Sequence, residues 1–442
     1  MEAALDKISS YVWGLPLIIL LFGTHLFLTF RLGFIQRHLL RAIRISFSSK
    51  KEGDGEISHF ASLMTALAAT IGTGNIVGVA AAVAAGGPGA VLWMWLTGVF
   101  GMATKYAEAL LSVKYRVADA QGRISGGPMY VLERGLGCKW LGTAFAAFTA
   151  VAAFGIGNMV QSNSIAGLAK ETFNINPALS GAVLCALTAL VILGGIKSIA
   201  AICEKLVPVM AIGYVAGCLY ILAANFGALP GTIALIFKSA FCGQAALGGF
   251  LGAGVKEAMR YGIARGLFSN ESGLGSAPIV AAAAQTRSPV RQALVSSTGT
   301  FWDTVVICLL TGLVVVGSGQ WQAGLKGAAL TRAAFGSIPH VGAFILNFGL
   351  FTFVYSTILG WEYYGEKAVE YLFGPKAAFP YRLAWVAAVM AGAVVSMPAV
   401  WAFADIANGC MALPNIISLL ALAPVAAAET KSYFAAPDSA SD

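Results

Sequence analysis

Long apolar runs separated by short polar segments make up most of the chain. A helix needs about 20 mostly apolar residues to cross a bilayer. Runs of that length predict spanning helices near residues 12–30, 59–84, 88–113, 141–169, 177–195, 206–225, 261–285, 293–316, 338–361, 381–400 and 402–426. The pattern predicts an all-α polytopic membrane protein with about eleven transmembrane helices. Two further stretches, 244–258 and 319–335, are too short or too polar to span and are expected to be surface helices.

Glycine and polar residues interrupt two of these runs. ATIGTGNIVG (69–78) lies in the middle of the second run, and GLFSNESGLGSAP (266–278) in the middle of the seventh. A glycine inside a helix costs about 1 kcal/mol relative to alanine, so both clusters need a reason. Close helix packing through small residues is one explanation. It does not account for the polar side chains beside these glycines, so broken helices are the preferred interpretation.

The two interruptions divide the chain into two halves of five spans, 59–225 and 261–426, each opening with its broken helix. This is the pattern of an inverted-repeat secondary transporter with a binding site at the membrane midplane. Segment 12–30 lacks the basic start and cleavage site of a signal peptide, so it is expected to be a retained, extra N-terminal helix. Residues 1–442 then form a single membrane transport domain.

Composition narrows the function classes. The chain is 58% hydrophobic and 11% charged, with a mean hydropathy of +0.78, whereas about a quarter of a soluble chain is charged. A net charge of +8 could indicate nucleic acid or anionic substrates, but basic loops on one membrane face explain it better. No nucleic-acid partner and no obligate protein partner are expected. The seven cysteines are scattered without a C-x-x-C pair, which indicates neither disulfides nor zinc.

Basic loops predict the orientation in the membrane. They follow the first and third runs and should face the cytoplasm, which places the N-terminus outside and the C-terminus in the cytoplasm. A basic segment at 256–265 is discordant with this topology. The residues concerned in the two loops are Arg31, Arg37, Arg41, Arg44, Lys50 and Lys51, and Lys114, Arg116, Arg123, Arg134 and Lys139.

Broken helices supply chemistry without ionised side chains. The half-helix that begins near Asn75 would present free backbone N–H groups and the positive end of its dipole, which suit a carboxylate. A second such end is expected after Asn270. The half-helices ending near Ile71 and Phe268 would offer carbonyl oxygens to a cation. One zwitterion and one sodium ion fit this arrangement.

Several segments carry a family resemblance. They are ATIGTGNIVGVA (69–80), SGGPMY (125–130), GNMVQSNSIA (157–166), ARGLFSNESGLGSAP (264–278), STILGWEYYGEKA (356–368) and DIANGCMALPN (405–415). They resemble the alanine or glycine:cation symporter family over nearly the whole chain. The resemblance implies the leucine-transporter type of fold and sodium-coupled uptake of alanine or glycine across the bacterial inner membrane. It implies no organic cofactor, with Na⁺ as the coupling ion and lipid as the surrounding medium.

The resemblance also implies site residues. Oxygen ligands suit a hard cation such as sodium. For Ser356 and Thr357, a hydroxyl bonded back to its own helix is the alternative; for Gln161 it is a helix-to-helix contact, and for Trp361 an interfacial anchor. The implied sodium ligands are Ala68, Thr70, Ile71, Asn75, Ser356 and Thr357, and the implied substrate residues are Thr73, Gly74, Asn75, Gln161, Phe268, Asn270, Thr357 and Trp361.

Four acidic residues, Glu108, Glu271, Asp303 and Asp405, lie in or near spans. Each needs a partner or water there. We expect structural roles, Glu271 capping a half-helix or pairing with Arg265. A proton relay through Asp303 or Asp405 would make the chain a proton-coupled carrier, and an ion channel or sensor is a further alternative. Walker, nucleophile-elbow and H-E-x-x-H motifs are absent from the sequence, so no enzyme is expected.

Overall fold

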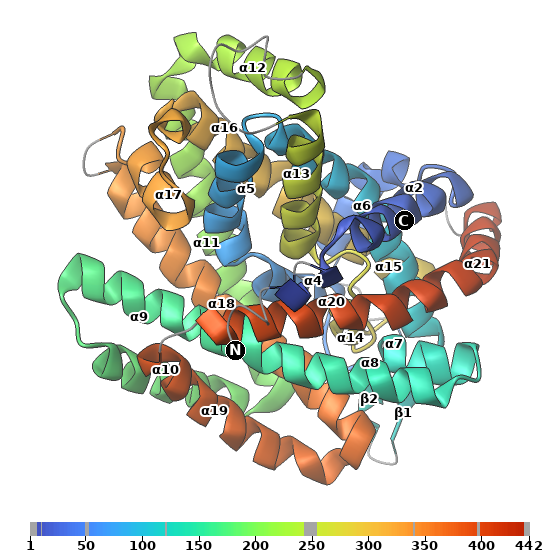
Figure 1. Cartoon of the computed structure of the whole chain (residues 1–442). Helices are drawn as coiled ribbons and strands as arrows, with labels where there is room; N and C mark the ends of the chain where they lie inside the picture. Colours follow the sequence, from blue (N-terminus) through green and yellow to red (C-terminus); the bar gives the residue numbers. More distant parts are fainter. Residues whose placement is uncertain are drawn as a thin grey trace.

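The computed structural model describes residues 7–9, 11–48, 53–119, 122–242, 254–338, 341–395 and 398–436. Nearly all of them are helical, and the described strands are the short antiparallel pair β1 (Val117–Ala118) and β2 (Ile124–Ser125). Figure 1 shows a bundle of helices that cross one another at many angles. Large apolar side chains such as Ile19, Leu190 and Ile212 are exposed on its outside, as expected of a surface that faces lipid.

The first part of the chain contains two bent helix pairs. A 67° bend separates α2 from the segment that leads into α3, and a 55° bend separates α4 from η2 and α5. Ser58 caps α4 by accepting a hydrogen bond from the Ala61 N–H. The elements are α2 (Leu15–Arg31), η1 (Ile35–His38), α3 (Leu39–Ser46), α4 (His59–Thr70), η2 (Gly74–Gly78), α5 (Val79–Gly86) and α6 (Ala90–Lys114).

The middle of the chain forms three long helical segments. α8, η4 and α9 form one continuous helical segment over Lys139–Phe173. The next helix, α10, begins with Pro177 in its first turn, and the side chain of Asn176 caps its N-terminus. The elements are α7 (Pro128–Tyr130), η3 (Val131–Gly135), α8 (Lys139–Ala152), η4 (Ala153–Met159), α9 (Val160–Phe173), α10 (Pro177–Ile192), α11 (Gly195–Ala224), η5 (Phe226–Ala228) and α12 (Leu229–Phe241).

The last part of the chain also begins with a broken helix, and long helices follow it. The elements are α13 (Val255–Asn270), α14 (Pro278–Ala281), α15 (Pro289–Thr300), η7 (Phe301–Cys308), α16 (Leu309–Gly317), η8 (Gln320–Ala323), α17 (Gly327–Phe335), α18 (Val341–Phe373), η9 (Pro375–Ala377), α19 (Ala378–Val394), α20 (Pro398–Ala421) and α21 (Ala423–Ala435).

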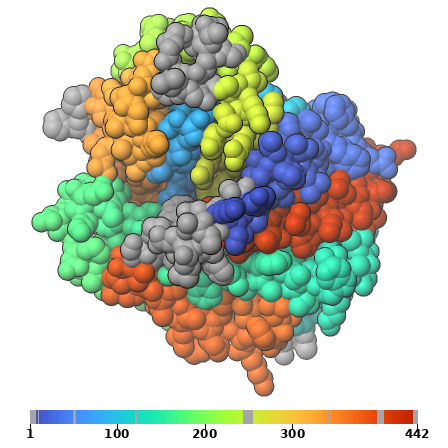
Figure 2. Space-filling view, in the orientation of Figure 1, coloured from blue at the N-terminus to red at the C-terminus, as the bar shows by residue number. Residues whose placement is uncertain are grey.

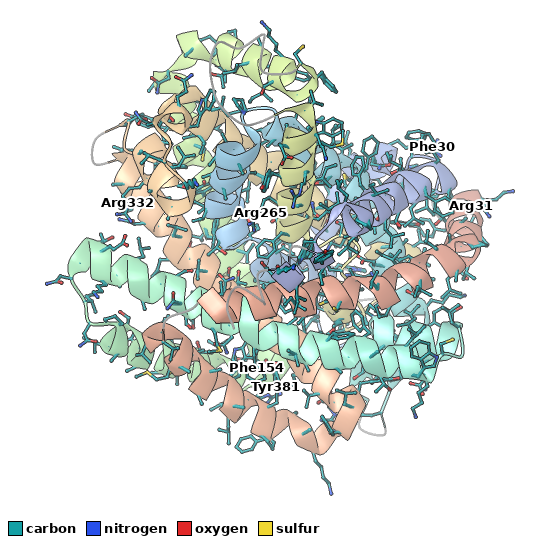
Figure 3. All side chains as sticks on the ribbon, in the orientation of Figure 1. Phe30, Arg31, Phe154, Arg265, Arg332 and Tyr381 are labelled. Carbon is teal, nitrogen blue, oxygen red and sulfur yellow. The ribbon has the colours of Figure 1, made fainter. Side chains whose placement is uncertain are left out.

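The helices pack in two groups. α6 packs against α13 and α15, and α5 packs against α13, so the two broken helices lie together. In the other group α10 packs against α19 and α9, and α8 packs against α18 and α20. Phe154 and Tyr381 meet edge to face between η4 and α19, with ring centroids 5.1 Å apart (Figure 3). α18 also contacts α4 of the first group, which places it beside the first break.

The predicted helical runs are confirmed as helices, with different edges. Within the described residues, six helices are long and apolar enough to span a membrane, or up to eight if each bent pair is one span, so the number eleven stays a prediction. α11 begins eleven residues earlier than predicted, at Gly195 rather than 206, and α18 extends to Phe373. α12 was not predicted, because its 13 residues are too few to span. Most of the surface helix predicted at 244–258 lies outside the described residues.

Candidate functional site

The first broken helix has the geometry that its glycines predict. α4 ends at Thr70, Ile71 is extended with φ −76° and ψ 96°, and the next helical segment begins at Gly74. The Gly72 N–H donates to Oδ1 of Asn75 at 2.9 Å, so the asparagine side chain closes the gap. These residues are buried, which leaves backbone polar groups in the centre of the protein.

The second break is longer than predicted. α13 ends at Asn270, Glu271 adopts a left-handed conformation with φ 55°, and helix does not resume until Pro278. The expectation of a half-helix starting directly after Asn270 is therefore wrong. Gly273 and Gly275, at φ 90° and 87°, keep the chain out of helical geometry, since left-handed backbone favours glycine. The break is thus a buried loop rather than a sharp kink.

Asp303 on η7 joins the two breaks. Its Oδ1 accepts from Asn75 Nδ2 at 2.6 Å, and its Oδ2 accepts from the Ser269 hydroxyl at 2.9 Å and the Thr304 hydroxyl at 2.6 Å. Asp303 and Asn75 are both completely buried. Sequence reasoning gave Asp303 a structural or relay role and did not place it at this site. An acidic residue inside an apolar run was the available signal.

A cluster of four oxygen atoms lies between α4 and α18. The Ser356 hydroxyl donates to the Ala68 carbonyl at 3.2 Å, and the Thr357 hydroxyl to the Ile71 carbonyl at 3.4 Å. Both hydroxyls also contact the Phe353 carbonyl of their own helix, at 2.8 and 2.9 Å. The structure therefore contains both the predicted grouping of these hydroxyls with the Ala68 and Ile71 carbonyls and the alternative, a hydrogen bond from each hydroxyl to its own helix. The Thr70 hydroxyl instead donates to the Ala66 carbonyl of its own helix at 3.1 Å.

Thr357 and Phe268 flank the first break from different helices. A Cβ built on Gly72 would lie 2.7 Å from Oγ1 of Thr357, and one built on Gly74 would lie 3.4 Å from Cδ1 of Phe268. The glycines therefore allow α13 and α18 to approach the broken backbone. The Arg265 guanidinium lies over the Phe268 ring, 5.8 Å from its centroid.

Trp361 is completely buried on α18, so the interfacial-anchor interpretation is wrong. Its indole N–H donates to Oε1 of Glu271 at 3.0 Å, and the Ser276 hydroxyl donates to the other oxygen of that carboxylate. The suggested pairing of Glu271 with Arg265 is absent from the ion pairs of the described residues. Instead, Glu271 fixes the orientation of the indole.

The side-chain amide of Gln161, on α9, has one atom with a hydrogen-bond partner and one without among the described residues. Its Nε2 donates to the Ile156 carbonyl at 2.8 Å, while its Oε1 is buried with no hydrogen-bond partner among the described residues. A buried acceptor without a donor costs about 1–3 kcal/mol. A ligand ammonium group is a donor that would satisfy it.

Glu108, on α6, holds the loop of the second break. Its Oε1 accepts from the Gly273 N–H, the Gly275 N–H and Asn415 Nδ2, at 3.0, 3.1 and 2.6 Å. This is the structural role expected for it. One turn earlier lies Lys105, only 3% exposed, whose Nζ has no hydrogen-bond partner among the described residues. Sequence reasoning missed this buried cation near three buried carboxylates.

A cavity connects the first break with one surface of the protein. Its volume is about 230 Å³, and its lining includes Thr73, Asn163, Leu350 and the ion-paired Glu171 and Arg332. Thr73 is 6% exposed, whereas the side chains of the ion pair are more than half exposed, so the cavity leads from the core to the rim (Figure 3 labels Arg332).

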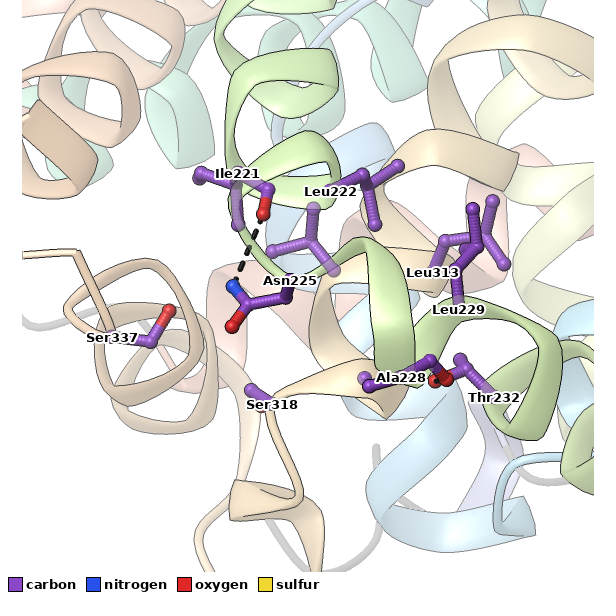
Figure 4. A pocket seen from close by; sticks show the side chains of 11 residues that line it. Ile221, Leu222, Asn225, Ala228, Leu229, Thr232, Leu313, Ser318 and Ser337 are labelled. Atoms are coloured by element: carbon purple, nitrogen blue, oxygen red, sulfur yellow. Dashed lines mark hydrogen bonds between the residues drawn. The ribbon is translucent and has the colours of Figure 1, made fainter.

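A smaller cavity is unrelated to these residues. It holds about 120 Å³ between α11, α12 and α16, and its lining includes none of the predicted site residues. Asn225, which lines it, donates to the Ile221 carbonyl of its own helix at 3.1 Å (Figure 4).

Comparison with known proteins identifies relatives along the full length. The model of the family described as "Sodium:alanine symporter family" matches residues 1–442. The chain is 54% identical to an uncharacterized transporter of Haemophilus influenzae, covering 98% of this chain and 96% of that one. It is 52% identical to the sodium/alanine symporter AgcS of Methanococcus maripaludis, covering 97% and 96%. The crystal structure of MhsT in complex with L-phenylalanine aligns with a TM-score of 0.57 at 15% identity, covering 85% of this chain and 98% of MhsT. MhsT has the leucine-transporter fold, so the predicted fold type is confirmed.

Proposed function

Because the chain belongs to the sodium:alanine symporter family, we propose that it couples the sodium gradient to uptake of a small neutral amino acid, alanine or glycine. Membership makes it a multi-pass secondary transporter of amino acids rather than an enzyme. The family name implies Na⁺ as the coupling ion. The proposed location is the bacterial inner membrane, with the N-terminus outside and the C-terminus in the cytoplasm.

The observation that carries the proposal is the oxygen cluster of Ala68, Ile71, Ser356 and Thr357. The two carbonyls are available because α4 ends there, and each hydroxyl oxygen already lies within hydrogen-bond distance of one of them. Rotation of each hydroxyl would direct its lone pairs inward beside the carbonyls. A buried set of neutral oxygens fits a hard monovalent cation. The four oxygens come from α18 and from the end of α4, so an ion bound by all of them would hold these two helices together.

A second cation position is proposed around Asn75 and Asp303. A carbonyl oxygen has two lone pairs, so Oδ1 of Asn75 can accept from Gly72 and still ligate an ion, with Thr70 contributing its carbonyl. Asp303 lies 2.6 Å from the amide of Asn75 and would supply the negative charge. In a low-dielectric interior, this charge favours a nearby cation.

The substrate is proposed to lie between the first break and α18. Its carboxylate would meet the N–H groups of Thr73 and Gly74 at the start of η2, where the helix dipole is positive. Asn75 lies beside them, and its own N–H donates to the Gly72 carbonyl at 3.3 Å. Its ammonium group would donate to Oε1 of Gln161, the buried acceptor that has no partner among the described residues. The Thr357 hydroxyl offers a further acceptor.

Bulky residues set the proposed size limit. Trp361 and Phe268 would form the walls, and Asn270 would lie at the end of α13 beside them. A pocket bounded by an indole and a phenyl ring leaves little room beyond a methyl group. Such a wall favours alanine and glycine over branched amino acids, although one methylene changes binding by only about 1–3 kcal/mol.

Transport is proposed to proceed by alternating access. The halves 59–225 and 261–426, related as an inverted repeat, would move against each other around the midplane site. The cavity that reaches Thr73 supports an access route from one side of the membrane, because it joins the first break to a surface of the protein. Closure on that side would involve the rim that carries Glu171 and Arg332.

The test is uptake of radiolabelled alanine by the purified protein in liposomes. An inward sodium gradient should drive accumulation, and replacing sodium with choline should abolish it. Competition by a panel of unlabelled amino acids then ranks the substrates. Accumulation at full rate in choline, driven by a proton gradient, would favour the alternative of a proton-coupled carrier, in which Asp303 or Asp405 is the relay.

A further inference from the structure

A basic groove lies far from the transport site, where the first long helix ends. It runs between the end of α2, η1 and the C-terminal helix α21, and its volume is about 690 Å³. Its lining includes Arg31, Leu32, Arg37, His38, Lys431 and Phe434. Figures 1 and 2 show the blue N-terminal segment beside the red C-terminal helix on the right of the molecule, and α2 contacts α21.

The groove lies at the end of a helix that the sequence predicts to span the bilayer. α2 is an apolar 17-residue helix that ends at Arg31, and its Ile19, Phe27 and Phe30 side chains are exposed. The chain then turns by 67° into the segment that contains α3, where Leu40 is 81% exposed. This geometry is that of a spanning helix followed by a helix in the interface plane. Phe30 and Arg31 are labelled in Figure 3.

Three positive charges face the groove, and none of them has an acidic partner among the described residues. Arg31, Arg37 and Lys431 are exposed, and the described residues contain no ion pair with any of them. Glu429, two residues from Lys431, instead pairs with Lys114 at 2.5 Å. Burial, followed by the neighbouring Arg37 and Arg41, lowers the pKa of His38, so this ring adds no charge at neutral pH.

Aromatic and cation–π contacts hold the wall of the groove together. The His38 ring stacks on Phe434 with centroids 4.2 Å apart. The Arg41 guanidinium lies 5.3 Å from the centroids of both Phe434 and Tyr433 and donates to the Tyr433 hydroxyl at 3.2 Å. These contacts fix α21 against η1 and α3, so the cationic side chains surround a preformed space.

We propose that this groove binds the headgroup of an anionic phospholipid from the leaflet in which α2 ends, which the basic loops predict to be the cytoplasmic one. The phosphate lies among Arg31, Arg37 and Lys431, and the acyl chains follow Phe27 and Phe30 along α2. Basic pockets at the ends of spanning helices bind anionic headgroups. A lipid fits better than a soluble anion because exposed apolar side chains continue directly from the cationic groove into the bilayer. The lipid would link the N-terminal helix to α21.

The experiment measures lipid binding to the full-length purified chain, independently of transport. Native mass spectrometry would titrate phosphatidylglycerol and phosphatidylcholine against the wild type and a variant carrying Arg31→Gln, Arg37→Gln and Lys431→Gln. The matched control carries Lys197→Gln, Lys205→Gln and Lys376→Gln, three exposed residues on the side of the membrane predicted to be the same. Each cation that faces a bound anionic headgroup is expected to contribute about fivefold to the affinity for that lipid, whereas cations away from the groove are not.

The triple groove variant should bind phosphatidylglycerol on the order of a hundredfold more weakly, and the control variant within about threefold of the wild type. Glycerophosphoglycerol, the headgroup without acyl chains, should not displace the lipid. Equal binding of phosphatidylcholine, unchanged binding by the groove variant, or displacement by the free headgroup would each overturn the proposal. Thermal unfolding of each variant checks folding, and the Arg31→Gln single variant, at an exposed position, gives a second test with about a fivefold loss.

Discussion

Removing the indole of Trp361 tests the proposed pocket directly. Trp361 is completely buried and its N–H donates to Glu271 at 3.0 Å. If the indole is a wall of the substrate site, Trp361→Ala opens space for a branched side chain. The carboxylate contacts at Thr73 and Gly74 and the ammonium contact at Gln161 stay in place. Valine and leucine should then become substrates.

The expected magnitude follows from the size of the change. Each carbon of a substrate that fills a pocket is worth about 1–3 kcal/mol, so affinity for valine relative to alanine should rise at least about tenfold. Affinity for alanine should fall, because its methyl group loses dispersion contacts with the ring. Truncation of a buried tryptophan also costs about 3–5 kcal/mol of folding free energy, and Glu271 loses a donor.

Competition against radiolabelled alanine uptake measures this change. Trp385→Ala is the matched control, because Trp385 on α19 is equally buried but packs against Phe154 and Tyr381. It should be destabilised similarly without admitting valine. Trp361→Phe retains most of the wall and should stay selective. The reasoning is refuted if Trp361→Ala folds, binds alanine as before and still rejects valine and leucine.

Three other changes test the ion and substrate contacts. Ser356→Ala should raise the sodium concentration for half-maximal uptake by about tenfold through loss of a ligand oxygen, whereas Thr352→Ala, whose hydroxyl bonds within the same helix, should leave it unchanged. Gln161→Leu should raise the KM for alanine at least about tenfold because the ammonium group loses its acceptor; an unchanged KM would argue for a role in helix packing. Asp303→Asn keeps the shape but removes the charge, so sodium affinity should fall in a titration of uptake while uptake stays sodium-dependent. An unchanged sodium affinity in this variant would contradict cation binding near Asp303.

The sequence by itself determined the membrane class, the helical fold and the place where the first half of each broken helix ends. Apolar length is a local property, and so is the conformational freedom of glycine, which is why the helix is interrupted between Thr70, where α4 ends, and Gly74, where η2 begins. The sequence predicted this break at Gly72–Gly74. The family motifs identified the fold type. They also grouped Ala68, Ile71, Ser356 and Thr357, which the structure brings within hydrogen-bond distance. Whether these atoms bind sodium stays a prediction.

Only the tertiary structure decided which buried polar groups meet. Asp303 lies 228 residues from Asn75 along the chain, yet their side chains are in contact, because η7 packs against η2. Glu108 holds Gly273 and Gly275 because α6 packs against α13. Hydropathy shows that a charged group inside a span needs a partner, but the partner is chosen by helix packing, which a one-dimensional pattern does not specify.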